Sequence, residues 1–155
     1  MGSEMCIRDR STAAGVARVT HDRVRPVAAY VDTGSVDLSA EVVLPDAVAG
    51  AGLAFRVVDD RNFWLWAPAL TRGSFTLVHV DDGFPRVVAS SDQVGTGDGV
   101  VIGVHAHGPT LELLVNASVV LTAVDDAPAG TGAGLGVRAV TTRAATFDDL
   151  TLTPA

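Results

Sequence analysis

The sequence predicts a single all-β domain in which two antiparallel sheets pack face to face. Apolar and polar residues alternate over short segments, as they do in half-buried strands. Turn-forming residues interrupt these segments about every 8 to 12 positions, a spacing typical of β-sandwiches. The chain has 16 Gly and 7 Pro in 155 residues, and no segment keeps the 3.6-residue periodicity of an amphipathic helix. A chain of this length is expected to form one domain.

Seven strands are expected in the first part of the chain, at 16–20, 27–32, 36–44, 53–59, 62–67, 74–80 and 86–90. The segment 36–44 alternates most clearly, and Pro45 ends it. The segments 53–59 and 62–67 predict a hairpin, because the acidic turn at Asp59-Asp60 separates two apolar runs. Asp82-Gly83 is a strong signal for a further hairpin turn.

Five more strands are expected at 100–106, 110–115, 118–123, 134–140 and 145–152. A Gly-Pro turn at Gly108-Pro109 and a tight turn at Asn116-Ala117 separate the first three of these, because Asn tolerates positive φ. The polar stretch 91–99 and the Gly-, Ala- and Pro-containing stretch 125–133 are expected loops. Five large apolar residues on the apolar phase of their strands are the expected core: Phe55, Leu65, Leu113, Leu135 and Phe147.

The charge of the chain excludes some partners. The net charge is −7, the sequence contains no Lys, and the pI is about 4.8. Nucleic-acid grooves need a basic stripe, so neither nucleic acid nor an anionic lipid surface is an expected partner. No apolar run reaches the length of a transmembrane helix, so membrane insertion is not expected.

The start of the chain does not follow the pattern of the rest. Residues 1–14 include the single cysteine, Cys6, and have no apolar core of a signal peptide. Residues 1–10 resemble a translated sequencing-adapter artefact, which predicts that Met1 is not a genuine start. We therefore expect a disordered or artefactual tail at 1–14 and the folded domain at 15–155.

Three stretches together resemble the concanavalin A-like lectin/glucanase domains, closest to laminin G-like modules of bacterial secreted and phage tail proteins. The first is 51–64, AGLAFRVVDDRNFW, similar to the family's hairpin with a short acidic turn. The second is the hairpin at 111–121, in which Ala117 replaces the usual turn Gly. The third is 134–137 followed by Phe147-Asp148-Asp149-Leu150, similar to the closing strands. The resemblance implies a two-sheet antiparallel jelly-roll sandwich.

The same resemblance implies a non-catalytic carbohydrate-binding or adhesion module within a larger secreted or phage tail protein, extracellular or on a virion, with a glycan or cell-surface polysaccharide as partner. The alternative is a structural spacer or assembly domain without its own ligand. Catalysis is not expected. Glycosidases need paired carboxylates, and Glu41 and Glu112 are each isolated along the chain. A Gly-x-Ser-x-Gly nucleophile motif is also missing from the sequence.

The expected carbohydrate site follows from pairing the first hairpin. If Val57 faces Phe63, then Arg56 faces Trp64 and Ala54 faces Trp66, on the outer face of one sheet. An exposed indole can stack on a sugar ring while a guanidinium donates to hydroxyl groups. His105 and His107 are expected to line the same face. The alternative is that the two tryptophans pack under a loop, or that Arg56 only contacts Trp64 by a cation–π interaction.

Metal binding is a further hypothesis without a defined site, and no other cofactor is expected. His105 and His107 are two residues apart, so on a strand both imidazoles point to one face and could meet one ion, with His79 as the only other histidine in the predicted sheets. Ca²⁺ takes oxygen ligands, and four acidic pairs could supply them: Asp59-Asp60, Asp81-Asp82, Asp125-Asp126 and Asp148-Asp149. Asp is also a routine turn residue, so a structural explanation stands beside each pair.

Overall fold

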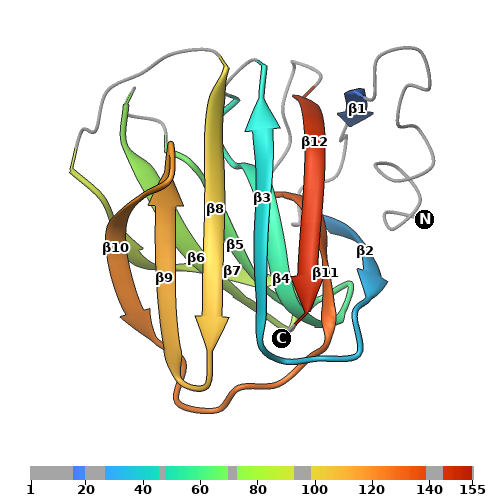
Figure 1. Cartoon of the computed structure of the whole chain (residues 1–155). Helices are drawn as coiled ribbons and strands as arrows, with labels where there is room; N and C mark the ends of the chain where they lie inside the picture. Colours follow the sequence, from blue (N-terminus) through green and yellow to red (C-terminus); the bar gives the residue numbers. More distant parts are fainter. Residues whose placement is uncertain are drawn as a thin grey trace.

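The computed structural model describes residues 16–19, 27–45, 48–69, 73–92, 99–138 and 145–154. These residues form two six-stranded antiparallel sheets packed face to face (Figure 1). The secondary structure of the described residues is strand without helix, which confirms the all-β prediction. The expected tail at 1–14 lies outside the described residues, so the proposed boundary at residue 15 stays a prediction.

Each sheet mixes strands from both ends of the chain. Sheet A has the order β1, β12, β3, β8, β9, β10, with bounds Val16–Val19, Ala145–Pro154, Leu38–Leu44, Val100–His107, Thr110–Val115 and Ser118–Val124. Sheet B has the order β2, β11, β4, β5, β6, β7, with bounds Val27–Asp32, Gly132–Val137, Ala51–Asp59, Asn62–Pro68, Phe75–Asp81 and Phe84–Ser90. All twelve expected strands are present, with ends shifted by a few residues.

The main core lies between the sheets, where the apolar phase of each strand meets the facing sheet. From sheet A, β3, β8 and β9 contribute alternate residues such as Val42, Ile102 and Leu113, each fully buried. From sheet B come Leu53, Phe55, Trp64 and Trp66, together with alternate residues of β6 and β11. Four of the five expected core residues belong to this layer: Phe55, Leu113, Leu135 and Phe147.

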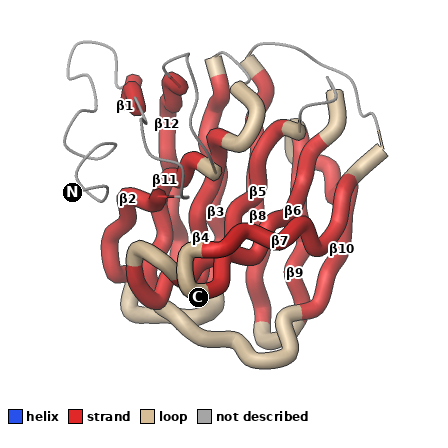
Figure 2. The backbone as a smooth tube through the Cα atoms, turned by 180° about the vertical axis from the view of Figure 1, so that it is seen from behind, coloured by secondary structure: helices blue, strands red, loops and turns tan. Residues whose placement is uncertain are grey.

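A second apolar cluster lies on the opposite, outer side of sheet B, which faces the viewer in Figure 2. It contains Ala28, Ala54, Val57, Phe63, Leu65, Ala67, Val78 and Val80, all of them buried, with Tyr30 packed against it. Leu65, the fifth expected core residue, is fully buried here rather than between the sheets. The central strands of sheet B therefore bury side chains on both faces.

The pairing of β4 with β5 differs from the expected register by one residue. Phe55 pairs with Trp64, Ala54 with Leu65 and Leu53 with Trp66. The pairing becomes irregular after Phe55, where Arg56 has a φ of 47°. Such a bulge lets neighbouring residues on one strand change face, so Phe55 enters the main core while Val57 joins the second cluster.

Candidate functional site

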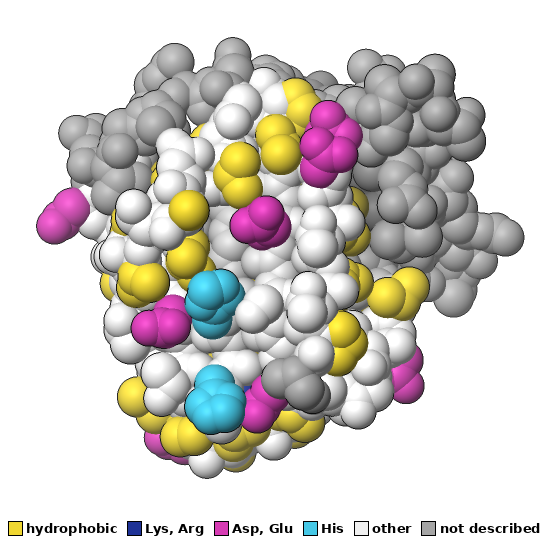
Figure 3. Space-filling model, viewed as in Figure 1, with side chains coloured by type: hydrophobic (Ala, Val, Ile, Leu, Met, Phe, Trp, Pro, Cys, Tyr) yellow, Lys and Arg dark blue, Asp and Glu magenta, His cyan; other side chains and the backbone are white. Residues whose placement is uncertain are grey.

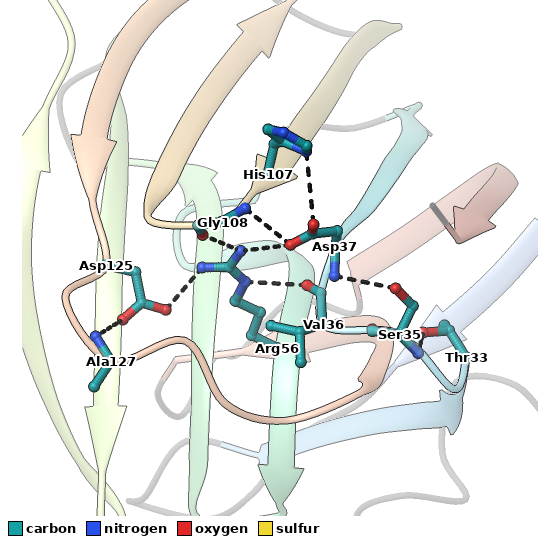
Figure 4. Close-up of polar contacts among 9 residues, drawn as sticks. All are labelled: Thr33, Ser35, Val36, Asp37, Arg56, His107, Gly108, Asp125 and Ala127. Atoms are coloured by element: carbon teal, nitrogen blue, oxygen red, sulfur yellow. Dashed lines mark hydrogen bonds and ion pairs between the residues drawn. The ribbon is translucent and has the colours of Figure 1, made fainter.

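Arg56 does not lie on an exposed sheet face, so the expected position on the outer face of sheet B was wrong. Its side chain is 0% exposed. The bulge in β4 turns this side chain toward one end of the sandwich, where loops from both sheets meet (Figure 4). A Cβ atom on Gly130 would lie 2.5 Å from the carbonyl oxygen of Arg56, so only glycine allows this close approach.

The guanidinium of Arg56 ties three connections together (Figure 4). Its Nε donates to the carbonyl of Val36 at 3.1 Å, and Nη1 donates to Asp125 Oδ2 at 2.9 Å. Nη2 donates to the carbonyl of Gly108 and contacts Asp37 Oδ1 at 3.4 Å. We call these five residues the Arg56 cluster. Two carboxylates compensate the buried charge, as burial of a guanidinium requires.

Trp64 and Trp66 also face the main core, so the expectation of exposed indoles was wrong. Trp66 is fully buried, and its Nε1 donates to the carbonyl of Leu114 on sheet A at 3.1 Å. Trp64 is 6% exposed and stacks between Phe55 and His79, with ring centroids 6.4 Å and 4.3 Å away. The packing alternative describes their positions, and ligand binding through these residues stays a prediction.

His79 ends this row of rings and lies half-buried on β6. Burial lowers the pKa of His79, and the positive charge of Arg86, its partner on β7, lowers it further. His79 belongs to sheet B, whereas His105 and His107 belong to β8 in sheet A. The three histidines therefore do not lie together, and the expectation that His79 completes a metal site with His105 and His107 was wrong.

His105 and His107 are exposed on the outer side of sheet A, which faces the viewer in Figure 3. They do not share a face with the tryptophans, contrary to expectation. His105 Nδ1 lies 3.8 Å from Glu112 Oε1 on β9, with both side chains about half exposed. His107 is 89% exposed, and its Nδ1 lies 3.6 Å from Asp37 Oδ2. Asp37 thus links an exposed imidazole to the Arg56 cluster.

Strand register gathers polar side chains around these histidines. One row across the sheet is Thr153, Ser39, His105, Glu112 and Thr122. The adjacent row is Thr151, Glu41, Gly103 and Leu114. We call the outer surface formed by these two rows and His107 the open face. Gly103 brings no side chain, so Glu41 and Leu114 flank a stretch of bare backbone.

The open face can exchange hydrogen bonds in both directions. Ser and Thr hydroxyls and neutral imidazoles both donate and accept, whereas carboxylates accept. Glu41 and Glu112 were expected to be isolated, yet the register brings both to one face, separated by β8. The signal was present in the sequence, because both occupy the polar phase of their strands. Placing the two glutamates on one face also requires the order of the strands in the sheet, and short sequence patterns do not reveal that order.

The described residues contain no group of three or more His, Cys, Asp or Glu side chains arranged to hold a metal ion. The acidic pairs are dispersed. Asp59 accepts hydrogen bonds from Arg61 and Asn62 within its turn, which lowers the pKa of Asp59. Asp125 belongs to the Arg56 cluster. Calcium binding stays a hypothesis.

Within the described part of the chain, no helix could cross a membrane.

The chain is similar in structure to known proteins, although its sequence is not. No protein-family model matches the sequence, and no curated protein matches it. Among solved structures, the carbohydrate binding module CBM66 from Bacillus subtilis is similar over 90% of this chain and 83% of that chain, at a TM-score of 0.64 and 18% identity. The fold is the concanavalin A-like jelly roll.

Further structures with this jelly roll differ in length. Sheep galectin-11 is similar over 86% of this chain and 99% of that chain, with a TM-score of 0.53 and 9% identity. The GH43 BlXynB protein from Bacillus licheniformis is similar over 91% of this chain, at a TM-score of 0.62 and 14% identity, and this chain spans only 33% of it. At such identities, the similarity shows the fold alone.

Proposed function

We propose that this jelly roll is a non-catalytic carbohydrate-binding or adhesion module whose ligand lies on the open face. One observation carries the proposal. Among the described residues, the central strands of sheet A expose polar groups on their outer side, whereas the outer side of the central strands of sheet B is apolar and buried. A hydroxyl-rich ligand therefore has hydrogen-bonding partners on sheet A and finds none in the apolar cluster of sheet B.

The chemistry of the open face fits saccharide hydroxyl groups. Glu41 and Glu112 offer acceptors, while Ser39, Thr151 and Thr153 offer hydroxyls on neighbouring strands. The proteins with similar structures include one whose title is a carbohydrate binding module and others that are galectins, and these titles support the same class of ligand.

The two glutamates of the open face lie two strands apart and one two-residue step along the strands. Standard strand spacings then place their Cα atoms about 12 Å apart, so the two carboxylates can contact different hydroxyl groups of one oligosaccharide. We extend the proposal to a module of a larger secreted or phage tail protein, acting outside the cell or on a virion, as the sequence resemblance implies.

A glycan array, probed with and without Ca²⁺, tests the proposal. The variants His105→Ala and Glu112→Gln remove neighbouring groups of the open face, and Arg61→Ala removes an exposed group at the β4–β5 turn as a matched control. Both open-face variants should lose most glycan binding at an unchanged melting temperature, and the control should keep it. Binding that survives both variants would place the ligand elsewhere. Binding that requires Ca²⁺ would add a calcium site.

The second candidate function is a structural spacer or assembly domain without a ligand of its own. Two observations favour it. Trp64 and Trp66 are buried, and the described residues of the open face include no large aromatic ring for stacking against a sugar. A folded protein that binds no glycan on the array, with or without Ca²⁺, would support this function.

A further inference from the structure

Charged side chains are distributed unequally between the two sheets. In sheet A, the edge strand β1 contains Arg18, whereas the other five strands, β3, β8, β9, β10 and β12, contain four carboxylates, Glu41, Glu112, Asp148 and Asp149, and no Arg or Lys. The arginines whose side chains the structure describes are Arg56, Arg61, Arg86 and Arg138, and all four belong to sheet B strands or to residues that follow them. Figure 3 accordingly shows acidic and histidine side chains on the open face and almost no arginine.

Among the described residues, Glu41 and Glu112 lack a strong internal partner on the open face, whereas Asp37 at its edge is held by Arg56 and by the N–H of Gly108. Glu112 faces the imidazole of His105 at 3.8 Å, and Asp37 faces His107 at 3.6 Å. Glu41 pairs with Gly103, which brings no side chain, and with Thr151 on its other side. Among the described side chains, the guanidinium that reaches the edge of this face is that of Arg56, which is buried and already shared by Asp37 and Asp125. The open face is therefore an acceptor-rich surface without an exposed permanent cation among its described residues.

We infer that the open face selects saccharides by charge, favouring those that carry amino groups and rejecting uronic acids and other anionic sugars. This inference rests on the proposed function. An ammonium group on a sugar would donate to Glu41 or Glu112, whereas a sugar carboxylate would meet like charges. Each exposed pair contributes little because water and salt screen it. The sum over the two glutamates should give a preference of roughly tenfold.

Three tetrasaccharides of different charge test the inference by calorimetry. A glucosamine tetramer and its N-acetylated form share one backbone and differ only in the amine, and a galacturonic acid tetramer supplies the anion. The buffer contains EDTA and keeps the amine protonated. We expect the free amine to bind roughly tenfold more tightly than the acetylated form and the uronic acid to bind more weakly than the acetylated form. Raising the salt from about 0.01 M to about 0.5 M should remove most of the preference.

Two variants separate the open face from the net charge of the whole protein. Glu41→Gln with Glu112→Gln should bring the ratio of the two affinities, amine over acetylated form, close to one. The ratio is measured at raised ligand concentrations, because Glu112→Gln is expected to weaken the binding of every glycan. Asp60→Asn with Asp81→Asn makes the same change in net charge at two exposed positions, one in the β4–β5 turn and one at the end of β6, and should keep the preference. A preference that both double variants reduce equally would reflect total charge and would overturn the inference.

The remaining outcomes are distinct. Binding of neutral glycans with no gain for the amine overturns the charge inference and leaves the proposed function standing. Binding of the uronic acid as tight as that of the amine also overturns it, and a repeat with Ca²⁺ in place of EDTA shows whether a bridging ion is responsible. Absence of binding to any tetrasaccharide and to the whole glycan array overturns both proposals together.

Discussion

Arg56 shows how one residue can decide the structure of a whole end of the domain. Its guanidinium satisfies acceptors from the β2–β3, β8–β9 and β10–β11 connections, which lie far apart in the sequence. Asp37 completes the arrangement by accepting the backbone N–H of Gly108 at 2.9 Å. These connections therefore depend on a planar group with several donors, which a lysine cannot replace.

Replacing Arg56 tests this dependence. Arg56→Met keeps much of the side-chain volume but leaves the carboxylate of Asp125, which is 8% exposed, without its cation. Removing one partner of a buried ion pair costs about 3 to 5 kcal/mol, and urea unfolding should show that loss. Arg61→Ala, which removes an exposed ion pair with Asp82, should cost about 1 kcal/mol or less. Similar losses in the two variants would contradict the role of the cluster.

His79 is a second residue with a measurable signature. Its pKa is lowered in the folded protein, because burial and Arg86 disfavour the imidazolium. The unfolded chain therefore binds the proton more readily, and stability should fall as the pH drops below about 6.5, the ordinary value for histidine. His79→Gln should lose less stability than the parent between about pH 7.5 and pH 5.5 in urea unfolding. An unchanged pH dependence would show that His79 does not contribute to it.

At the scale of elements, β5 is unusual because both of its faces are buried. Phe63, Leu65 and Ala67 point into the second cluster, and Trp64 and Trp66 point into the main core. A strand of this kind reads as a continuous apolar run and lacks the alternation that distinguishes an inner from an outer face. Its register is then set by the bulge at Arg56 rather than by its own pattern.

The core position of Trp64 makes it a test of this register. Trp64→Ala should lower the free energy of unfolding by about 3 to 5 kcal/mol, the usual loss for a buried aromatic residue. Melting temperature and glycan affinity should be measured on the same preparation, at a temperature where the variant remains folded. A stable variant that has lost glycan binding would instead restore Trp64 to the binding site.

The close packing of β11 gives a second test at this scale. A Cβ atom on Gly134 would collide with the carbonyl oxygen of Ala29 on β2, whereas a Cβ on Gly103 would lie 3.2 Å from its nearest neighbour, the carbonyl oxygen of Ala40. Gly134→Ala should therefore cost about 1 to 3 kcal/mol through overpacking, and Gly103→Ala clearly less. Chemical denaturation of the two variants provides a matched comparison, and equal losses would contradict it.

For the whole molecule, the sequence predicted the fold more fully than the site. All twelve strands could be found because alternation and turn residues are local signals, as at 36–44 with Pro45. The burial of Arg56 and Trp64 could not be predicted in this way, because it depends on one bulge. The positive φ of that bulge falls on Arg56, a residue type without a preference for it. The pairing of Glu41 and Glu112 on one face required the order of β3, β8 and β9.

The boundary of the domain remains a prediction at this scale. Residues 1–14 show no strand pattern in the sequence, so their deletion should leave the melting temperature nearly unchanged. Thermal unfolding of the full chain and of the chain starting at Gly15 compares the two. A drop of several degrees after deletion would mean that this segment contributes to the folded domain.

The contrast between the two outer sheet surfaces has a consequence for engineering. Side chains on the open face, such as Ser39, Glu41 and Thr151, leave the sheet toward solvent. Their replacement should disturb packing little, whereas nearly every change in the central strands of sheet B would meet a close-packed neighbour. The domain therefore offers one surface on which many residues could be randomised at once, as a display scaffold from which new binding specificities could be selected.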